Sequence, residues 1–138
     1  MSNGRKRLSW EETALKLAFN IAEYRSEDPY VQCGAVILKN DYSFILGYNG
    51  AVMGIDIDWS NREERRKRVL HSETNAANFI KPGEAILIAV TALPCFECIK
   101  VIAQKKIPLI IYRDELTGYD NDFAKKLAGE FGIVLKRL

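Results

Sequence analysis

Hydrophobic positions in the first thirty residues recur at the spacing of one face of a helix. Ser9, followed three residues later by Glu12, is typical of a capping box that opens a helix. The apolar positions that follow at helical spacing are Trp10, Ala14, Leu17, Ala18 and Ile21. Pro29 disfavours helical angles at Asp28, so the helix is expected to end near that point.

Short apolar runs alternate with helical patterns through the rest of the chain. Strands are predicted at 33–38, 43–48, 85–91, 109–112 and 132–138, and helices at about 72–79, 95–105 and 121–131. Asn40 and Asp41 favour a hairpin turn between the first two strands. The later alternation is typical of βαβ units, which require parallel strands with helices on both faces of the sheet. The sequence therefore predicts an α/β fold with a mixed sheet.

Residues 62–68 (REERRKR) are a dense run of charges without an apolar position. The pattern favours a solvated helix face on which Glu63 and Glu64 pair with basic neighbours. The alternative is that the arginines contact a nucleotide phosphate, at an active or a regulatory site.

Length and composition exclude several classes of protein. The 138 residues fit one domain, expected over 1–138, and 48% hydrophobic with 28% charged residues is typical of a globular protein. A net charge of +2 does not favour a nucleic acid partner. No apolar run reaches the roughly 20 residues of a membrane helix, and the basic start lacks the apolar core of a signal peptide. We therefore expect a cytoplasmic protein that does not enter a membrane.

Two short motifs carry metal-binding residues. His71-Ser72-Glu73 and Pro94-Cys95-Phe96-Glu97-Cys98 each stand where a loop enters a predicted helix. Two cysteines separated by two residues can bind one ion from the first turn of a helix, whose partial positive charge favours thiolate. An odd total of three cysteines argues against a disulfide framework and favours such a use.

A site with three protein ligands leaves the fourth tetrahedral position of a zinc ion open, as catalysis requires. With His71, Cys95 and Cys98 as ligands, zinc would lower the pKa of a bound water to about 7. Glu73, two residues after the histidine, is placed to carry protons. The competing interpretation is a closed structural site with Cys33 as fourth ligand, although a cysteine at a strand start more often packs in a core. The pattern also fits His71 as a buried, hydrogen-bonded side chain and Glu73 as a helix-start carboxylate.

The two motifs together resemble the signature of the zinc nucleobase deaminases. Over about residues 10–113, the chain resembles the deoxycytidylate deaminases of the cytidine deaminase-like superfamily. The resemblance rests on these motifs and on the following residues: Arg25-Ser26, Asp28-Pro29, Gln32, Gly34-Ala35, Gly47-Tyr48-Asn49-Gly50 and Asn75-Ala76. It implies a three-layer α/β/α sandwich with a mixed five-stranded sheet. It also implies zinc as cofactor, Glu73 as the proton carrier, and a homo-oligomer, commonly a hexamer.

The same resemblance implies the substrate contacts. Arg25 and Ser26 are expected near the substrate phosphate, and Asn49 at the deoxyribose or the base. Ser72 and Thr91 are expected to complete the set. Tyr119, Asp120 and Arg113 lie in the stretch where relatives place late contacts. The residue pattern alone leaves Arg25 open as a solvated helix-end arginine and Asn49 as a turn residue.

The expected reaction is the hydrolysis of dCMP to dUMP and ammonia, which supplies deoxyuridylate for thymidylate synthesis. The motifs also fit a deaminase of a nucleoside, a guanine-type base, a riboflavin-pathway intermediate or a transfer RNA adenosine, or a zinc module without activity. The chain departs from the family pattern in two places. Ser72 replaces the usual alanine, and residues 51–54 lack the proline of the stretch that binds regulatory triphosphates, which puts such regulation in doubt.

Overall fold

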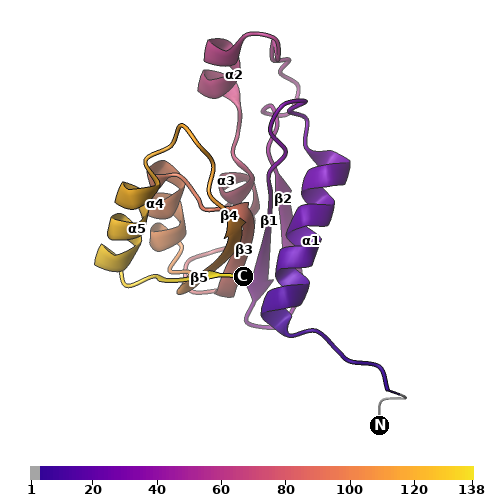
Figure 1. Cartoon of the computed structure of the whole chain (residues 1–138), viewed down its shortest axis with the longest axis vertical. Coiled ribbons are helices and arrows are strands. Elements are labelled where there is room, and N and C mark those ends of the chain that lie inside the picture. The colour runs from indigo at the N-terminus through magenta and orange to yellow at the C-terminus, as the bar shows by residue number, and fades with distance from the viewer. Residues whose placement is uncertain (1–3) are drawn as a thin grey trace.

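The computed structural model describes residues 4–138, which form a sheet of five strands covered by helices on both faces (Figure 1). The strands are β1 (Gly34–Lys39), β2 (Phe44–Tyr48), β3 (Ala85–Ala92), β4 (Leu109–Asp114) and β5 (Val134–Arg137). The helices are α1 (Trp10–Arg25), α2 (Arg62–Arg68), α3 (Ser72–Ala77), α4 (Phe96–Gln104) and α5 (Asn121–Glu130). The elements expected from the hydrophobic pattern are thus present within a few residues of their predicted bounds. The structure also contains α2, which this pattern did not predict.

The strand order β2-β1-β3-β4-β5 makes the sheet mixed, as expected. β1 pairs antiparallel with both β2 and β3, whereas β3 pairs parallel with β4 and β4 with β5. The antiparallel part follows from the hairpin between β1 and β2, and the parallel part from the helical crossovers α4 and α5. In Figure 1, α1 covers one face of this sheet and α4 with α5 lie on the other side.

Alternate residues of the strands enter two separate hydrophobic cores. On one face, α1 contributes Ala14, Leu15 and Ala18, which pack with strand residues that include Val36 and Ala89. The other face is covered by α3, α4 and α5, whose buried residues include Ala76, Ile99, Ile102, Ala124 and Ala128. β3 is buried on both faces, as its continuous apolar run predicts. The three-layer α/β/α architecture implied by the resemblance is therefore confirmed.

Helix α1 begins at the predicted capping box. Ser9 accepts a hydrogen bond from the Glu12 backbone N–H at 3.0 Å, and its hydroxyl donates to the Glu12 carboxylate at 3.0 Å. The helix ends at Arg25, before Pro29. The chain then enters the 26–33 loop, of which Asp28, Val31 and Cys33 line the cleft of the candidate site.

Helix α2 is the element that the hydrophobic pattern did not predict. It has no buried residue, so no apolar stripe reveals it. Its stability comes from local contacts: Asn61 caps the first turn by accepting from the Glu64 N–H at 3.1 Å, and Arg68 pairs with Glu64 one turn away. The expected pairing inside the charge run is therefore present for Glu64.

Candidate active site

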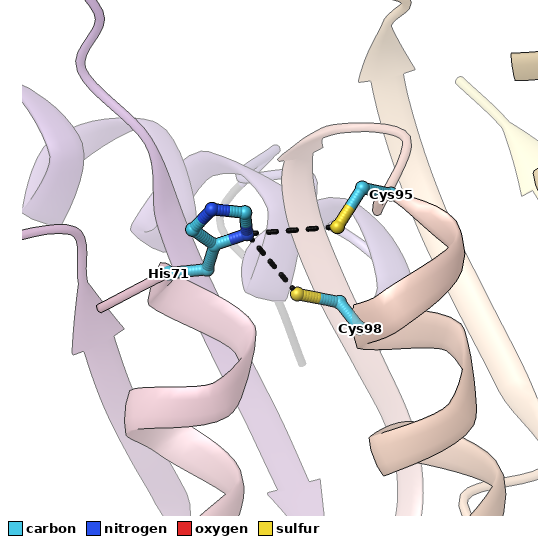
Figure 2. A group of neighbouring side chains, drawn as sticks. All are labelled: His71, Cys95 and Cys98. Atoms are coloured by element: carbon cyan, nitrogen blue, oxygen red, sulfur yellow. Dashed lines mark hydrogen bonds between the residues drawn. The ribbon is translucent and has the colours of Figure 1, made fainter. Parts of the chain in front are cut away.

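His71, Cys95 and Cys98 come together at the N-terminal ends of two neighbouring helices (Figure 2). His71 is the N-cap residue of α3, and Cys95 is the N-cap residue of α4. The His71 Nδ1 lies 3.3 Å from the Cys98 Sγ and 3.6 Å from the Cys95 Sγ. All three ligand atoms lie within 4.8 Å of one another. Among residues 4–138 the structure brings no fourth histidine, cysteine, aspartate or glutamate into this cluster.

The spacing of these atoms fits a tetrahedral zinc ion. Zn–N bonds of about 2.05 Å and Zn–S bonds of about 2.3 Å at tetrahedral angles give an N···S separation of about 3.6 Å. The two measured N···S distances lie close to this value. Two sulfurs with one imidazole nitrogen are also a donor set that zinc prefers. The residues present therefore fit the ion.

The electrostatics of the cluster favour the thiolate form of Cys95. A hydrogen bond from the Cys98 thiol lowers the pKa of Cys95 to about 4, and hydrogen bonding from His71 adds to this effect. The pKa of Cys98 is raised, because it donates to Cys95 and is buried. The pKa of His71 is raised mainly by its hydrogen bond to Cys95. The cluster thus favours a thiolate at Cys95, and thiolate is the form of cysteine that binds zinc.

Cys33 lies outside the cluster, at the wall of the same cleft. Burial, with the nearby Glu73 carboxylate, raises the pKa of Cys33 to about 12. Cys33 is not among the side chains whose ligand atoms lie within 4.8 Å of one another. The geometry of the described residues therefore gives an open three-residue cluster, rather than a closed one that includes Cys33.

Glu73 is buried beside the cluster, with 5% of its surface exposed. Its Oε1 accepts a hydrogen bond of 2.6 Å from the hydroxyl of Ser72, which is itself completely buried. Both residues line the cleft that contains the cluster. The serine that departs from the family pattern therefore helps to orient the carboxylate.

The cleft has a volume of about 290 Å³. His71, Ser72, Glu73 and Cys95 form its metal end. The other lining residues come from distant segments of the chain: Asp28, Val31, Cys33, Asn49, Arg62, Arg65, Arg66, Val69, Val90, Ala92, Leu93, Leu116, Thr117 and Tyr119. A concave site with buried polar groups and a metal cluster at one end suits a small ligand.

The expected substrate contacts divide into two groups. Asn49 and Ser72 line the cleft, whereas Arg25, Ser26 and Thr91 do not. Arg25 is exposed and lies over the Tyr48 ring, with 5.8 Å between its guanidinium carbon and the ring centroid. This geometry gives no support to a direct substrate contact by Arg25.

Ser26 and Thr91 have structural partners instead. The Ser26 hydroxyl donates to the Asn49 side-chain oxygen. The Thr91 hydroxyl is buried and accepts from the Gly34 N–H at 3.2 Å, across the β1–β3 pair. Both residues therefore support the wall of the cleft from behind, and an effect of either on substrate would pass through a neighbour.

Asn49 joins three segments through its amide group. Its oxygen accepts from Ser26 and from the Cys33 N–H, and its Nδ2 donates to the Val31 carbonyl at 2.8 Å. A side-chain amide has two N–H groups, so one remains for a ligand. The residue is thus both a turn residue and a candidate contact, which combines the two interpretations left open by the sequence.

The loop after β4 supplies cleft residues that the sequence pattern did not reveal, Leu116 and Thr117. Ligands of open α/β sheets bind outside the carboxyl ends of the strands, and this rule would have selected 115–120. Tyr119 also lines the cleft, whereas Arg113 lies over the Phe19 ring and Asp120 caps α5. Of the three late candidates, the structure therefore brings only Tyr119 to the site.

A three-layer fold with a histidine and two cysteines at paired helix starts, and a carboxylate beside them, defines the class of zinc-dependent deaminases. Residues 8–113 match the family model described as the cytidine and deoxycytidylate deaminase zinc-binding region. The chain belongs to this family. Zinc is accordingly its cofactor.

Relatives and solved structures agree with this assignment. The chain is 32% identical to human deoxycytidylate deaminase over 131 residues, which cover 85% of the chain and 71% of the human protein. It is 26% identical to ComE operon protein 2 of Bacillus subtilis, with 96% and 73% covered. The dCMP deaminase of cyanophage S-TIM5, solved with dCMP and dUMP, has a TM-score of 0.77 at 23% identity, with 97% and 100% covered. This last likeness shows the fold.

Proposed function

We propose that this chain, as a single deaminase domain, hydrolyses dCMP to dUMP and ammonia. The observation that carries the proposal is the open cluster of His71, Cys95 and Cys98 with the buried Glu73 at one end of a cleft. Human deoxycytidylate deaminase, a relative by sequence, supports the choice of substrate.

His71, Cys95 and Cys98 would hold the zinc ion. When bound, the ion supplies the nucleophile, because it lowers the pKa of a water molecule to about 7. Glu73 would accept the proton of that water and donate it to the ring nitrogen of cytosine beside the amino-bearing carbon. The carboxylate would then take a second proton, from the hydroxyl group that has added to the ring carbon, and pass it to the amino group, which leaves as ammonia. Ser72 would hold the carboxylate in place through its 2.6 Å hydrogen bond.

The remaining walls of the cleft would orient the nucleotide. Asn49 retains one amide hydrogen for the sugar or the base. Val31, Val90 and Leu93 supply apolar surface beside the reacting ring. Exclusion of bulk water by these side chains would strengthen the electrostatic contacts inside the cleft.

The test compares dCMP, deoxycytidine, CMP and dCTP as substrates of the zinc-loaded protein. Turnover is measured as the loss of cytosine absorbance. We expect turnover of dCMP, and a Glu73→Gln variant without it. Turnover of deoxycytidine alone would retain the chemistry and overturn the nucleotide assignment. No release of ammonia from any of the four would overturn the proposal, and a guanine-type base or a transfer RNA would be tested next.

The proposal includes a homo-oligomer, for which a hexamer is the expected form. The loop after β2 exposes apolar side chains that a neighbouring copy could cover: Val52, Met53 and Ile55 are 55%, 97% and 58% exposed. Light scattering coupled to gel filtration tests this. A monomeric mass at micromolar concentration would contradict it.

A cytoplasmic location is the last part of the proposal. Two cysteines that bind zinc as thiolates persist best in a reducing compartment. Within residues 4–138, no helix is long and apolar enough to cross a membrane. Fractionation of cells that express the chain would place it, and recovery outside the cytoplasm would contradict this part.

A further inference from the structure

The four arginines of α2 divide into two pairs with different surroundings. Arg65 and Arg68 are held by protein partners. Arg65 donates to the Trp59 carbonyl at 3.1 Å, lies over the Tyr30 ring and is 3.9 Å from the Asp28 carboxylate. Arg68 pairs with Glu64. Their charges are therefore used inside the protein.

Arg62 and Arg66 have no such partners. Within residues 4–138, neither guanidinium group makes a hydrogen bond or an ion pair. The guanidinium carbon of Arg66 lies 5.5 Å from the centroid of the Tyr119 ring, a cation–π contact that orients the group without neutralising its charge. Each guanidinium thus keeps its five N–H donors for a ligand.

The two free guanidinium groups converge on Gly118, in the loop between β4 and α5. A Cβ atom at Gly118 would lie 3.5 Å from one Arg66 nitrogen and 3.9 Å from one Arg62 nitrogen. Since residues 62 and 66 are one helical turn apart, their like charges repel each other by about 0.2–0.5 kcal/mol in an isolated helix. An anion between them would remove this repulsion.

Both side chains line the cleft that ends at His71 and Glu73. Gly118 has φ +85°, a conformation that glycine adopts without strain, and its lack of a side chain leaves room beside the two arginines. The lining of the cleft therefore combines residues of the metal cluster, apolar side chains and two unpaired guanidinium groups. A nucleoside 5′-phosphate carries a group for each of these surfaces: a reacting amino group, the apolar face of the base and a phosphate.

We propose that Arg62 and Arg66, at the Gly118 turn, are the specificity-determining residues that bind the 5′-phosphate of the substrate, in place of Arg25 and Ser26. The proposal rests on the proposed function, which supplies the substrate. Two guanidinium groups can each make paired, charge-assisted hydrogen bonds to one phosphate dianion. The selectivity for a nucleotide over a nucleoside then arises from α2, which lies beyond the ends of the strands, at the top of Figure 1.

The test compares a double variant, Arg62→Gln with Arg66→Gln, with a matched control, Lys67→Gln with Arg68→Gln. Both remove two positive charges from α2, but Lys67 and Arg68 do not line the cleft. Calorimetry measures the binding of dUMP and deoxyuridine, and initial rates give kcat/KM for dCMP and deoxycytidine. Thermal unfolding checks that both variants fold.

We expect the Arg62/Arg66 variant to lose on the order of 100-fold in dUMP affinity and in kcat/KM for dCMP, since charged hydrogen bonds are lost at two positions. Deoxyuridine binding and deoxycytidine turnover should not change, because these ligands lack the phosphate. The control should retain the nucleotide preference of the original protein. An additional Arg25→Gln variant should retain it as well.

Equal losses in the two double variants would overturn the proposal, as would loss of the preference in Arg25→Gln alone. If the protein deaminates no cytosine nucleotide, the proposed function fails, and the subsite is judged by calorimetry with inorganic phosphate. Phosphate binding that disappears only in the Arg62/Arg66 variant supports an anion subsite at Gly118. If the original protein binds no phosphate, the proposed anion subsite is overturned.

Discussion

At the scale of single residues, the carboxylate of Glu73 is set apart by its surroundings. It is buried next to a cluster that attracts a dication, yet it is not one of the cluster's ligand groups. Ser72 occupies one of its oxygens, which leaves the other for proton transfer. Burial without metal ligation is the arrangement that a general acid-base group needs.

We expect Glu73→Gln to lower kcat for dCMP by at least about 10²-fold, because a positioned proton carrier contributes roughly 10²–10⁴-fold. Zinc content should remain at the level of the original protein, since His71, Cys95 and Cys98 are intact. Ammonia release and metal analysis measure the two quantities. The control is Glu97→Gln, an exposed carboxylate paired with Lys100 in the first turn of α4. Loss of zinc in Glu73→Gln would contradict the assigned role.

At the scale of elements, α3 can pack closely against β2 because Gly47 has no side chain. A Cβ at Gly47 would lie 2.4 Å from the Ser72 carbonyl oxygen and 2.7 Å from the Ala76 backbone nitrogen. Neither backbone atom can move without the helix. The family motif Gly-Tyr-Asn-Gly therefore has a physical explanation: Gly47 seats α3, and Asn49 ties together the neighbouring loop.

Gly47→Ala should destabilise the fold by about 1–3 kcal/mol, because overpacking forces the helix off the sheet. Activity should fall as well, since α3 begins next to His71 and carries Glu73. Urea unfolding and kcat measure the two effects. The matched control is Gly129→Ala in α5, where nothing lies within 4 Å of the added atom. That change should stabilise the protein by up to about 1 kcal/mol, because alanine favours a helix interior. Equal unfolding midpoints for both variants would contradict this account of Gly47.

The elements were predictable to different degrees. β3 was recognised because eight consecutive residues are almost entirely buried, which demands a continuous apolar run. Helix α1 was recognised because its cap is local in sequence. Helix α2 was indicated only by its charges, since a helix that buries no residue has no hydrophobic periodicity from which its bounds could be predicted.

At the scale of the whole molecule, zinc would link two helices, α3, which precedes β3 in the chain, and α4, which follows it. His71 comes from the start of α3, and Cys95 and Cys98 come from the start of α4. A ligand that binds only the folded state stabilises it by mass action. The metal is therefore expected to contribute to the stability of the fold as well as to catalysis.

Removal of zinc by a chelator should lower the melting temperature by several degrees, since zinc at 100 times its Kd contributes about 2.7 kcal/mol. Differential scanning calorimetry with and without chelator measures the change. Cys98→Ser should lose the zinc-dependent shift. Cys33→Ser should keep it, because Cys33 lies outside the cluster. Loss of the shift in Cys33→Ser would instead favour the closed structural site.

The sequence by itself determined the ligand types and the order of the strands and helices. Cys95 with Cys98, and His71 with Glu73, are separated by less than one helical turn, so their proximity is a local property that spacing reveals. The same holds for the capping box of Ser9 and for the apolar run of β3. Such features depend only on residues that are close together in the sequence, so the sequence is sufficient to predict them.

Only the tertiary structure decided which polar residues face the cleft. Arg25 and Thr91 are close in sequence to the site's strands and helices, yet they point to other partners. Arg62 and Arg66 meet Gly118, much later in the chain, only because α2 folds back over the loop after β4. The direction of a side chain and the meeting of distant segments are set by long-range packing, which no local pattern in the sequence records.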